Sequence, residues 1–233
     1  MTNGTGKTLP STGASNATDV SAFLERAARS APIGRGRGRL AFALDATLSR
    51  QPTWDLACTL QADLFRVAAD LGGLDVKLIY YRGLEECRAS KWVSDTASLG
   101  RLMASISCQG GQTQISRVLG HLEGEAERNG LKAAVFVGDA LEENADVLCH
   151  RAGRLGVLGL KLFIFQEGHD KRAQTVFREM ARLSGGAWCP FAPGASDQLR
   201  TLLRAVAAYA AGGRPALAAS RERGALALLS VMD

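Results

Sequence analysis

Apolar runs and helically spaced apolar residues alternate along this chain, and the pattern predicts strands that alternate with helices. Short apolar runs predict strands at 40–45, 74–81, 132–138, 160–166 and 186–191, and a short edge strand at 86–92. Apolar residues at helical spacing predict helices at 53–71, 96–107, 114–128, 171–183 and 196–211, with another starting at 141–144. This alternation indicates an α/β fold with a mostly parallel sheet that is covered by helices on both faces.

The predicted elements occupy the middle of the chain and leave a segment at each end. We expect a flexible N-terminal tail at 1–38 that contains a short helix at 19–30, one domain at 39–212, and a C-terminal extension at 213–233. The extension ends in an apolar run at 224–232, which either folds back on its own domain or docks on another protein. With 233 residues, 46% of them hydrophobic, the chain can bury one substantial core.

Charge and cysteine content narrow the environment and the partners that we expect. The formal net charge is +5, but residues 1–39 hold six Lys and Arg against two Asp and Glu, so little excess remains for the domain. Nucleic-acid contact is therefore expected only from the Gly-Arg run at 34–39, which is also typical of a flexible linker. Five cysteines without a CxxC pair, and no long apolar segment, predict a cytoplasmic protein that does not enter the membrane.

Polar side chains with oxygen atoms follow two of the predicted strands. Asp45, Thr47 and Ser49 occupy every second position after the first strand, Asp139 follows the strand at 132–138, and Thr113 precedes a helix. In parallel sheets, ligands bind beyond the carboxyl ends of the strands where the strand order reverses, so these residues are expected on one rim. Two carboxylates and three hydroxyls form an oxygen set suited to Mg²⁺, Mn²⁺ or Ca²⁺.

Each of these residues also has a purely structural interpretation. Asp45 can cap the turn after its strand, Thr113 can be a helix N-cap, and Asp139 can complement the dipole of the helix that follows it. The metal hypothesis is favoured because the residues are all expected at the same edge of the sheet.

Three segments resemble the von Willebrand factor type A (VWA) family and its metal-ion-dependent adhesion site (MIDAS). Asp45-Ala-Thr-Leu-Ser49 is similar to the family's DxSxS, Gly110-Gly-Gln-Thr-Gln-Ile115 to its Gly-Gly-x-Thr-x-Ile, and residues 135–139 to the strand that carries its second aspartate. The resemblance extends over about residues 39–212. It implies a doubly wound sheet with one antiparallel edge strand, here at 86–92.

For function, the resemblance implies binding to a partner protein. The implied metal ligands are Asp45, Thr47, Ser49, Thr113 and Asp139, and the metal, Mg²⁺ or else Mn²⁺ or Ca²⁺, would bridge to an Asp or Glu of the partner. The expected partner-binding rim consists of Gly111, Gln112, Ala140, Glu167 and His169. Intracellular members of the family often work in multi-subunit or ATPase-linked assemblies, and the resemblance implies a partner of this kind.

The chain departs from the family pattern at two positions. Thr47 replaces the usual serine, which keeps the oxygen ligand but adds a methyl group that stiffens the side chain. Ala140 stands where members of the family often have a glycine, and this substitution is expected to restrict the loop after Asp139.

Two other functions fit parts of the same pattern. Asp45 and Asp139 also resemble the nucleophile and the magnesium ligand of a haloacid dehalogenase-type phosphohydrolase, but Thr47 occupies the position of its general acid. The third alternative is a metal-free scaffold that has the VWA fold and binds its partner elsewhere.

Overall fold

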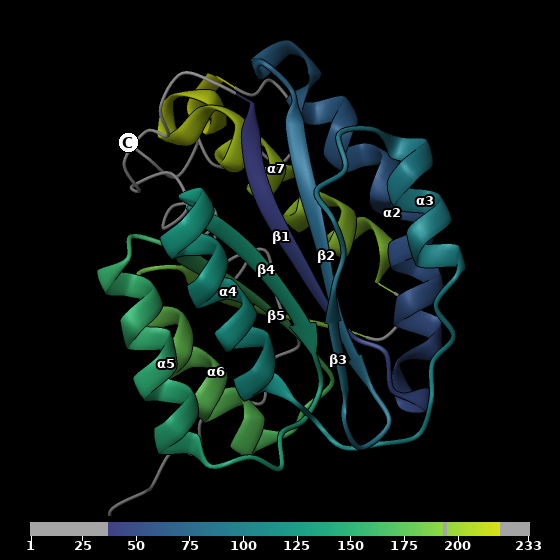
Figure 1. Cartoon of the computed structure of the whole chain (residues 1–233), viewed down its shortest axis with the longest axis vertical. Coiled ribbons are helices and arrows are strands. Elements are labelled where there is room, and N and C mark those ends of the chain that lie inside the picture. Colours follow the sequence, from purple (N-terminus) through teal and green to yellow (C-terminus); the bar gives the residue numbers. More distant parts are fainter. Residues whose placement is uncertain (1–36, 193–194, 220–233) are drawn as a thin grey trace, which may run out of the picture.

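The computed structural model describes residues 37–192 and 195–219, and these form a six-stranded sheet between two layers of helices (Figure 1). The predicted helix at 19–30, the first half of the Gly-Arg run (34–36) and the apolar run at 224–232 lie outside the described residues. The strands are β1 (Gly38–Asp45), β2 (Leu74–Arg82), β3 (Glu86–Ala89), β4 (Ala133–Gly138), β5 (Lys161–Glu167) and β6 (Ala187–Phe191).

The sheet has the predicted doubly wound topology. Its strand order is β3-β2-β1-β4-β5-β6, and every neighbouring pair is parallel except β2 and β3, which are antiparallel. The predicted fold class is thus confirmed. The edge strand is shorter than the predicted 86–92, because its ladder with β2 ends at Ala89 and only one isolated bridge, between Val76 and Val93, follows.

The helices agree with the prediction except at some of their ends. They are α2 (Gln51–Ala68), α3 (Thr96–Ala104), α4 (Ile115–Asn129), α5 (Ala145–Val157), α6 (Lys171–Leu183) and α7 (Ser196–Ala219), with 3₁₀ turns η1 (Leu48–Arg50) and η2 (Ala69–Leu71) on either side of α2. α5 starts later than the expected 141–144, because the Asn144 side chain caps it by accepting from the Asp146 and Val147 N–H groups. α7 continues past residue 211, with a break at Gly213.

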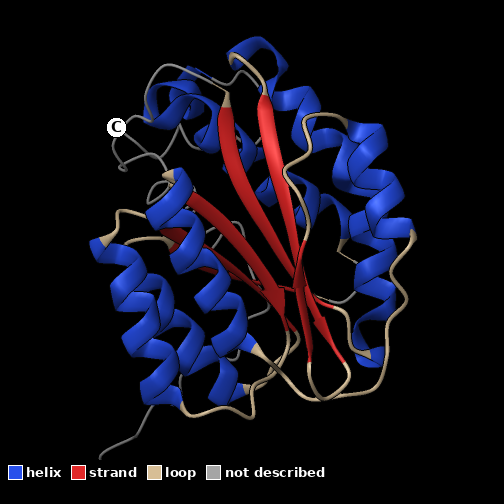
Figure 2. Ribbon diagram, viewed as in Figure 1, coloured by secondary structure: helices blue, strands red, loops and turns tan. Residues whose placement is uncertain are grey.

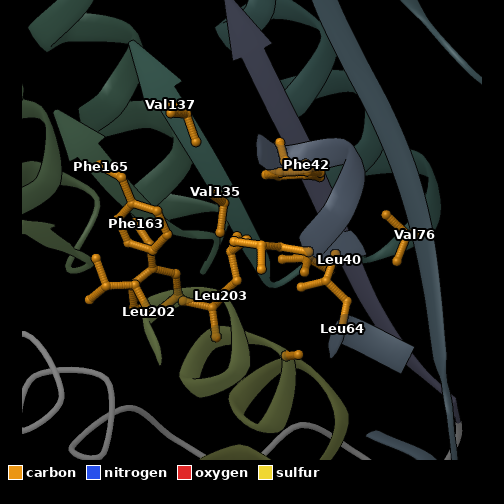
Figure 3. Packing of buried hydrophobic residues seen from close by; sticks show 14 of the residues in the cluster. Leu40, Phe42, Leu64, Val76, Val135, Val137, Phe163, Phe165, Leu202 and Leu203 are labelled. Atoms are coloured by element: carbon orange, nitrogen blue, oxygen red, sulfur yellow. The ribbon is translucent and has the colours of Figure 1, made fainter. Parts of the chain in front are cut away.

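Both faces of the sheet are buried under helices, which explains why its strands are almost entirely apolar. On one face, Phe42, Val135 and Phe163 pack against Leu202 and Leu203 of α7 (Figure 3), together with residues of α2 and α3. The other face packs against α4, α5 and α6. Within the described part of the chain, no helix is long and apolar enough to cross a membrane.

The strand order reverses between β1 and β4, which lie side by side in the middle of the sheet. From β1 the chain adds β2 and β3 on one side, and β4, β5 and β6 on the other. The parallel strands run toward one edge where loops gather (Figure 2). β1 ends at Asp45 and β4 at Gly138, immediately before Asp139, so both aspartates lie where ligands bind in such folds.

Candidate functional site

A pocket of about 240 Å³ opens at this switch point, and all five predicted metal ligands line it. Three segments build the pocket: the turn after β1, the loop before α4 and the loop after β4. Its lining residues are Asp45, Thr47, Leu48, Ser49, Gly110, Gly111, Thr113, Asp139, Ala140 and Glu142.

The turn after β1 brings one carboxylate and two hydroxyls together. The Thr47 backbone N–H donates to Asp45 Oδ1 at 2.7 Å, and the Thr47 and Ser49 hydroxyl oxygens lie 3.1 Å apart. Asp45 and Thr47 are buried, while Ser49 is exposed. The N–H bond to Asp45 is the turn-capping role that the structural interpretation assigned to it, and the same turn directs the hydroxyls to the pocket.

Burial leaves the Asp45 carboxylate short of compensating charge. Loss of water raises the pKa of Asp45 above its ordinary 3.8, and nearby Asp139 raises it further, although hydrogen bonds from Thr47 act in the opposite direction. A buried anion of this kind is stabilised by any cation that enters the pocket.

The loop before α4 is held against the β2–β3 turn by close backbone contact. A Cβ atom added to Gly111 would lie 2.0 Å from the Gly83 carbonyl oxygen, and the Gln112 N–H donates to that oxygen at 3.2 Å. The Gln109 N–H donates to the Ala46 carbonyl at 3.0 Å, which ties the loop to the turn after β1. Gly111 therefore lets this loop approach closely enough to line the pocket.

Thr113 does not cap α4, because the cap residue is Gln114. The Thr113 N–H and hydroxyl both donate to Glu142 Oε2, each at 2.8 Å. Glu143 then satisfies the first turn of α4 by accepting from the N–H groups of Ile115 and Ser116. The helix-cap interpretation of Thr113 is thus wrong, and the two glutamates join the loop after β4 to the start of α4.

Asp139 lies beside a cation that the sequence interpretation did not include. Arg50 Nη2 is 3.2 Å from Asp139 Oδ2, and Arg50 Nη1 donates to Glu167 Oε2. The Thr53 hydroxyl donates to the same Glu167 oxygen. Glu167 was predicted as an exposed rim residue, and this is corrected: only 3% of its side chain is exposed, because it is held by Arg50 beneath the surface.

The other rim residues are accessible to different degrees. Gly111, Gln112 and His169 are exposed, and Ala140 is half-buried in the pocket wall. Among the described residues, no residue other than glycine has a positive φ. Ala140 therefore adopts its loop conformation without the strain that would require glycine, and the expected restriction does not distort this loop.

The sequence interpretation missed Arg50, Glu142, Glu143 and Tyr81. Arg50 follows Ser49 directly, so its charge beside the motif was the signal that could have pointed to it. Glu142 and Glu143 were assigned to the start of a helix. Tyr81 ends up near Asp45 because β2 is paired with β1 in register, with Asp45 opposite Tyr81. Such contacts between distant segments have no local sequence pattern.

The buried Tyr81 hydroxyl provides a test of the fit to a metal. It makes no hydrogen bond of ordinary geometry with any described residue, yet it lies close enough to the Asp45 carboxylate that the two influence each other's pKa. Burial and the neighbouring carboxylates raise the Tyr81 pKa well above its ordinary 10.0, so the hydroxyl stays a donor. A hydroxyl beside a metal-binding carboxylate supports it when it donates to the carboxylate, and Tyr81 is placed to do so for Asp45.

We expect Tyr81→Phe to lower the affinity for Mg²⁺ by about fivefold and to change the free energy of unfolding by less than about 1 kcal/mol. The reason is that the hydroxyl supports Asp45 but has no other partner to lose. Calorimetric titration and thermal melts measure the two quantities. In the control, Tyr80→Phe, the lost bond to Glu86 lies away from the pocket, so this variant should bind Mg²⁺ like the wild type. Equal affinities for all three proteins would contradict this role of Tyr81.

The donor atoms in the pocket fit a hard divalent cation. No group of three or more His, Cys, Asp or Glu side chains is placed for metal binding among the residues that the structure describes. A metal held here would rely on the Asp45 and Asp139 carboxylates, since Glu142, the third carboxylate of the pocket, accepts from Thr113. Hydroxyl and water oxygens would complete its shell. That donor set is typical of Mg²⁺, Mn²⁺ or Ca²⁺ sites and offers no nitrogen or sulfur.

Comparison with known proteins defines the fold class. No protein-family model and no curated protein sequence matches the chain. Among solved structures, it is similar to a von Willebrand factor type A protein from Catenulispora acidiphila, with 16% identity over 75% of this chain and 43% of that chain and a TM-score of 0.59. It is also similar to the SpRpn10 VWA domain, with 11% identity over 70% of this chain and 94% of that chain and a TM-score of 0.55.

A third similar structure is proximal thread matrix protein 1 from the mussel byssus, described with a zinc-occupied MIDAS motif. It shows 15% identity over 74% of this chain and 45% of that chain, with a TM-score of 0.52. The chain thus has a VWA-like α/β fold, with a six-stranded sheet that is parallel except at one edge.

Proposed function

We propose that this chain is a protein-interaction domain that binds an Asp or Glu side chain of a partner protein through a divalent cation. Asp45, Thr47, Ser49, Thr113 and Asp139 would hold the cation, and Gly111, Gln112, Ala140 and His169 would contact the partner. The observation that carries the proposal is the meeting of all five oxygen donors in one pocket at the sheet's switch point.

The charges of the proposed ligands favour binding over catalysis. Two carboxylates neutralise a divalent cation formally, and the neutral hydroxyls leave it able to accept one further anionic oxygen. A carboxylate from a partner would supply that oxygen. We propose Mg²⁺ as the resident ion, with Mn²⁺ and Ca²⁺ as alternatives, and the zinc-occupied MIDAS of the mussel protein supports a divalent cation in this type of fold.

The cellular compartment and the type of assembly are also proposals. We place the protein in the cytoplasm, as one member of a multi-subunit or ATPase-linked assembly. The similarity to the SpRpn10 VWA domain supports an interaction role for this fold, and the sequence of the described domain carries little excess positive charge for nucleic acid.

Affinity capture tests the proposed function directly. The tagged wild type, Asp45→Ala and the control Asp55→Ala are exposed to a cell lysate with Mg²⁺ or with chelator. Asp55 is an exposed residue of α2 that accepts a hydrogen bond from Gln51 and does not line the pocket, so its replacement leaves the pocket intact. We expect partner proteins that bind the wild type and Asp55→Ala in Mg²⁺ and are lost with Asp45→Ala or chelator.

Two other results would contradict the proposal. Equal recovery by all proteins in both buffers would favour the metal-free scaffold. Hydrolysis of generic phosphoesters by the wild type, abolished by Asp45→Asn, would favour the phosphohydrolase. The lack of an acid at position 47 argues against the latter.

A further inference from the structure

Arg50 occupies an unusual place for a cation, because it lies against the proposed metal site. It is the residue directly after the Asp45–Ser49 motif and stands immediately before α2. Its side chain is 12% exposed, and its Nε atom has no hydrogen-bond partner within the part of the chain that the structure describes. The guanidinium is therefore held mainly by its charged contacts.

Those contacts divide one guanidinium between two carboxylates from different strands. Nη2 is 3.2 Å from Asp139 Oδ2 after β4, and Nη1 donates to Glu167 Oε2 at the end of β5. Of these two carboxylates, Asp139 lines the pocket and Glu167 does not; Glu167 is buried and also accepts from Thr53. Arg50 thus connects a proposed metal ligand to a carboxylate that has no access to the metal.

The two carboxylates place different demands on Arg50. Glu167 is buried, and a buried carboxylate without a paired cation is strongly destabilising, so Glu167 keeps Arg50 near this edge of the sheet. The Asp139 side chain is 25% exposed and has an alternative partner in any cation that enters the pocket. A divalent ion at Asp139 and the guanidinium beside it repel each other, and the repulsion is strong at partly buried positions.

We propose that Arg50 competes with the divalent cation for Asp139 and thereby sets the metal affinity of the site, while Glu167 determines how much of Arg50 is available for that competition. This inference rests on the proposed function, because it assigns the regulation of the same site. Metal enters as Arg50 moves from Asp139 toward Glu167, and Arg50 returns to Asp139 when the metal leaves.

Two variants that both lack the Glu167 carboxylate separate this role from a general structural one. Glu167→Gln frees Arg50 from its buried partner and leaves Asp139 as its only carboxylate, so metal affinity should fall about fivefold. Glu167→Gln combined with Arg50→Met removes the competitor without leaving a buried charge, so affinity should rise about tenfold above that of the wild type. Calorimetric titration with Mg²⁺ and Mn²⁺ measures both changes.

The matched control is the double variant Arg82→Met with Glu86→Gln. Arg82 Nε and Glu86 Oε2 form another ion pair, 2.9 Å long, near the same end of the sheet, but neither residue lines the pocket. The metal affinity of this control variant should equal that of the wild type. If the Arg50→Met double variant fails to fold by circular dichroism, Arg50→Gln with Glu167→Gln makes the same charge change with a polar side chain.

The possible results distinguish this inference from the proposed function. Affinity that rises in the double variant and falls in Glu167→Gln supports both. Metal binding by the wild type with equal or weaker binding by the double variant overturns the role of Arg50 and leaves the proposed function standing. Binding by the double variant alone supports the competition but contradicts the proposed function of the wild type. Failure of every variant to bind metal contradicts both.

Discussion

Mg²⁺ should stabilise the wild-type protein against heat and leave Asp45→Asn unaffected. Ligand that binds only the folded state adds about 2.7 kcal/mol at a concentration one hundred times Kd. For a domain of this size that corresponds to a rise of roughly 5–10 °C in Tm. Asparagine keeps the shape of Asp45 and an oxygen to accept the Thr47 N–H, but it removes one of the two charges that neutralise the cation.

The same variant should be more stable than the wild type in chelator. Burial raises the Asp45 pKa in the folded state, so the ionised carboxylate opposes folding at neutral pH. This cost disappears as pH falls through the raised pKa, because the folded protein then takes up the proton. We expect Asp45→Asn to gain about 1 kcal/mol at pH 7 without metal, and the gain to shrink as the pH is lowered.

Thermal melts of both proteins, with Mg²⁺ and with chelator at several pH values, measure these effects. Asp55→Asn is the control, since Asp55 is an exposed aspartate outside the pocket, and it should respond to Mg²⁺ like the wild type. The same Tm for the wild type with Mg²⁺ and with chelator would contradict the metal site. If Asp45→Asn is less stable than the wild type without metal, the ionised Asp45 carboxylate does not destabilise the metal-free protein, and this prediction is contradicted.

Gly111→Ala should abolish the rise in Tm that Mg²⁺ produces, because the added methyl group displaces the backbone of the loop before α4. The new Cβ would lie 2.0 Å from the Gly83 carbonyl oxygen, a distance that requires the loop or the β2–β3 turn to move. Overpacking of this kind costs about 1–3 kcal/mol. The movement would carry Thr113 away from the pocket and break the Gln112 N–H bond to Gly83.

The neighbouring glycine supplies a control in the same loop. A Cβ at Gly110 would meet only Leu48 Cδ1 at 3.6 Å, an ordinary contact distance. Gly110→Ala should therefore melt close to the wild type and keep its Mg²⁺ stabilisation. If Gly111→Ala also keeps a wild-type Tm and a wild-type Mg²⁺ shift, close packing of this loop on the β2–β3 turn does not form the site.

Regular elements were predictable because their signals are local. The apolar runs of the strands and the helical spacing that follows each of them define an alternating α/β order, and parallel strands buried on both faces produce these runs directly. The late start of α5 was missed because Asn144 caps that helix by a side-chain hydrogen bond, which competes with an equally plausible acidic start at 141–144.

The sequence by itself determined the fold class and the set of oxygen donors, since the spacing of Asp45, Thr47 and Ser49 and the position of Asp139 after a strand are properties of short segments. Tertiary structure decided what surrounds those donors. Strand order brought β5 beside β4, so Glu167 became the buried partner of Arg50 and not a surface residue. The physical reason is that ion pairs and close backbone contacts join segments far apart in the chain, and their charges and shapes leave no periodic pattern within either segment.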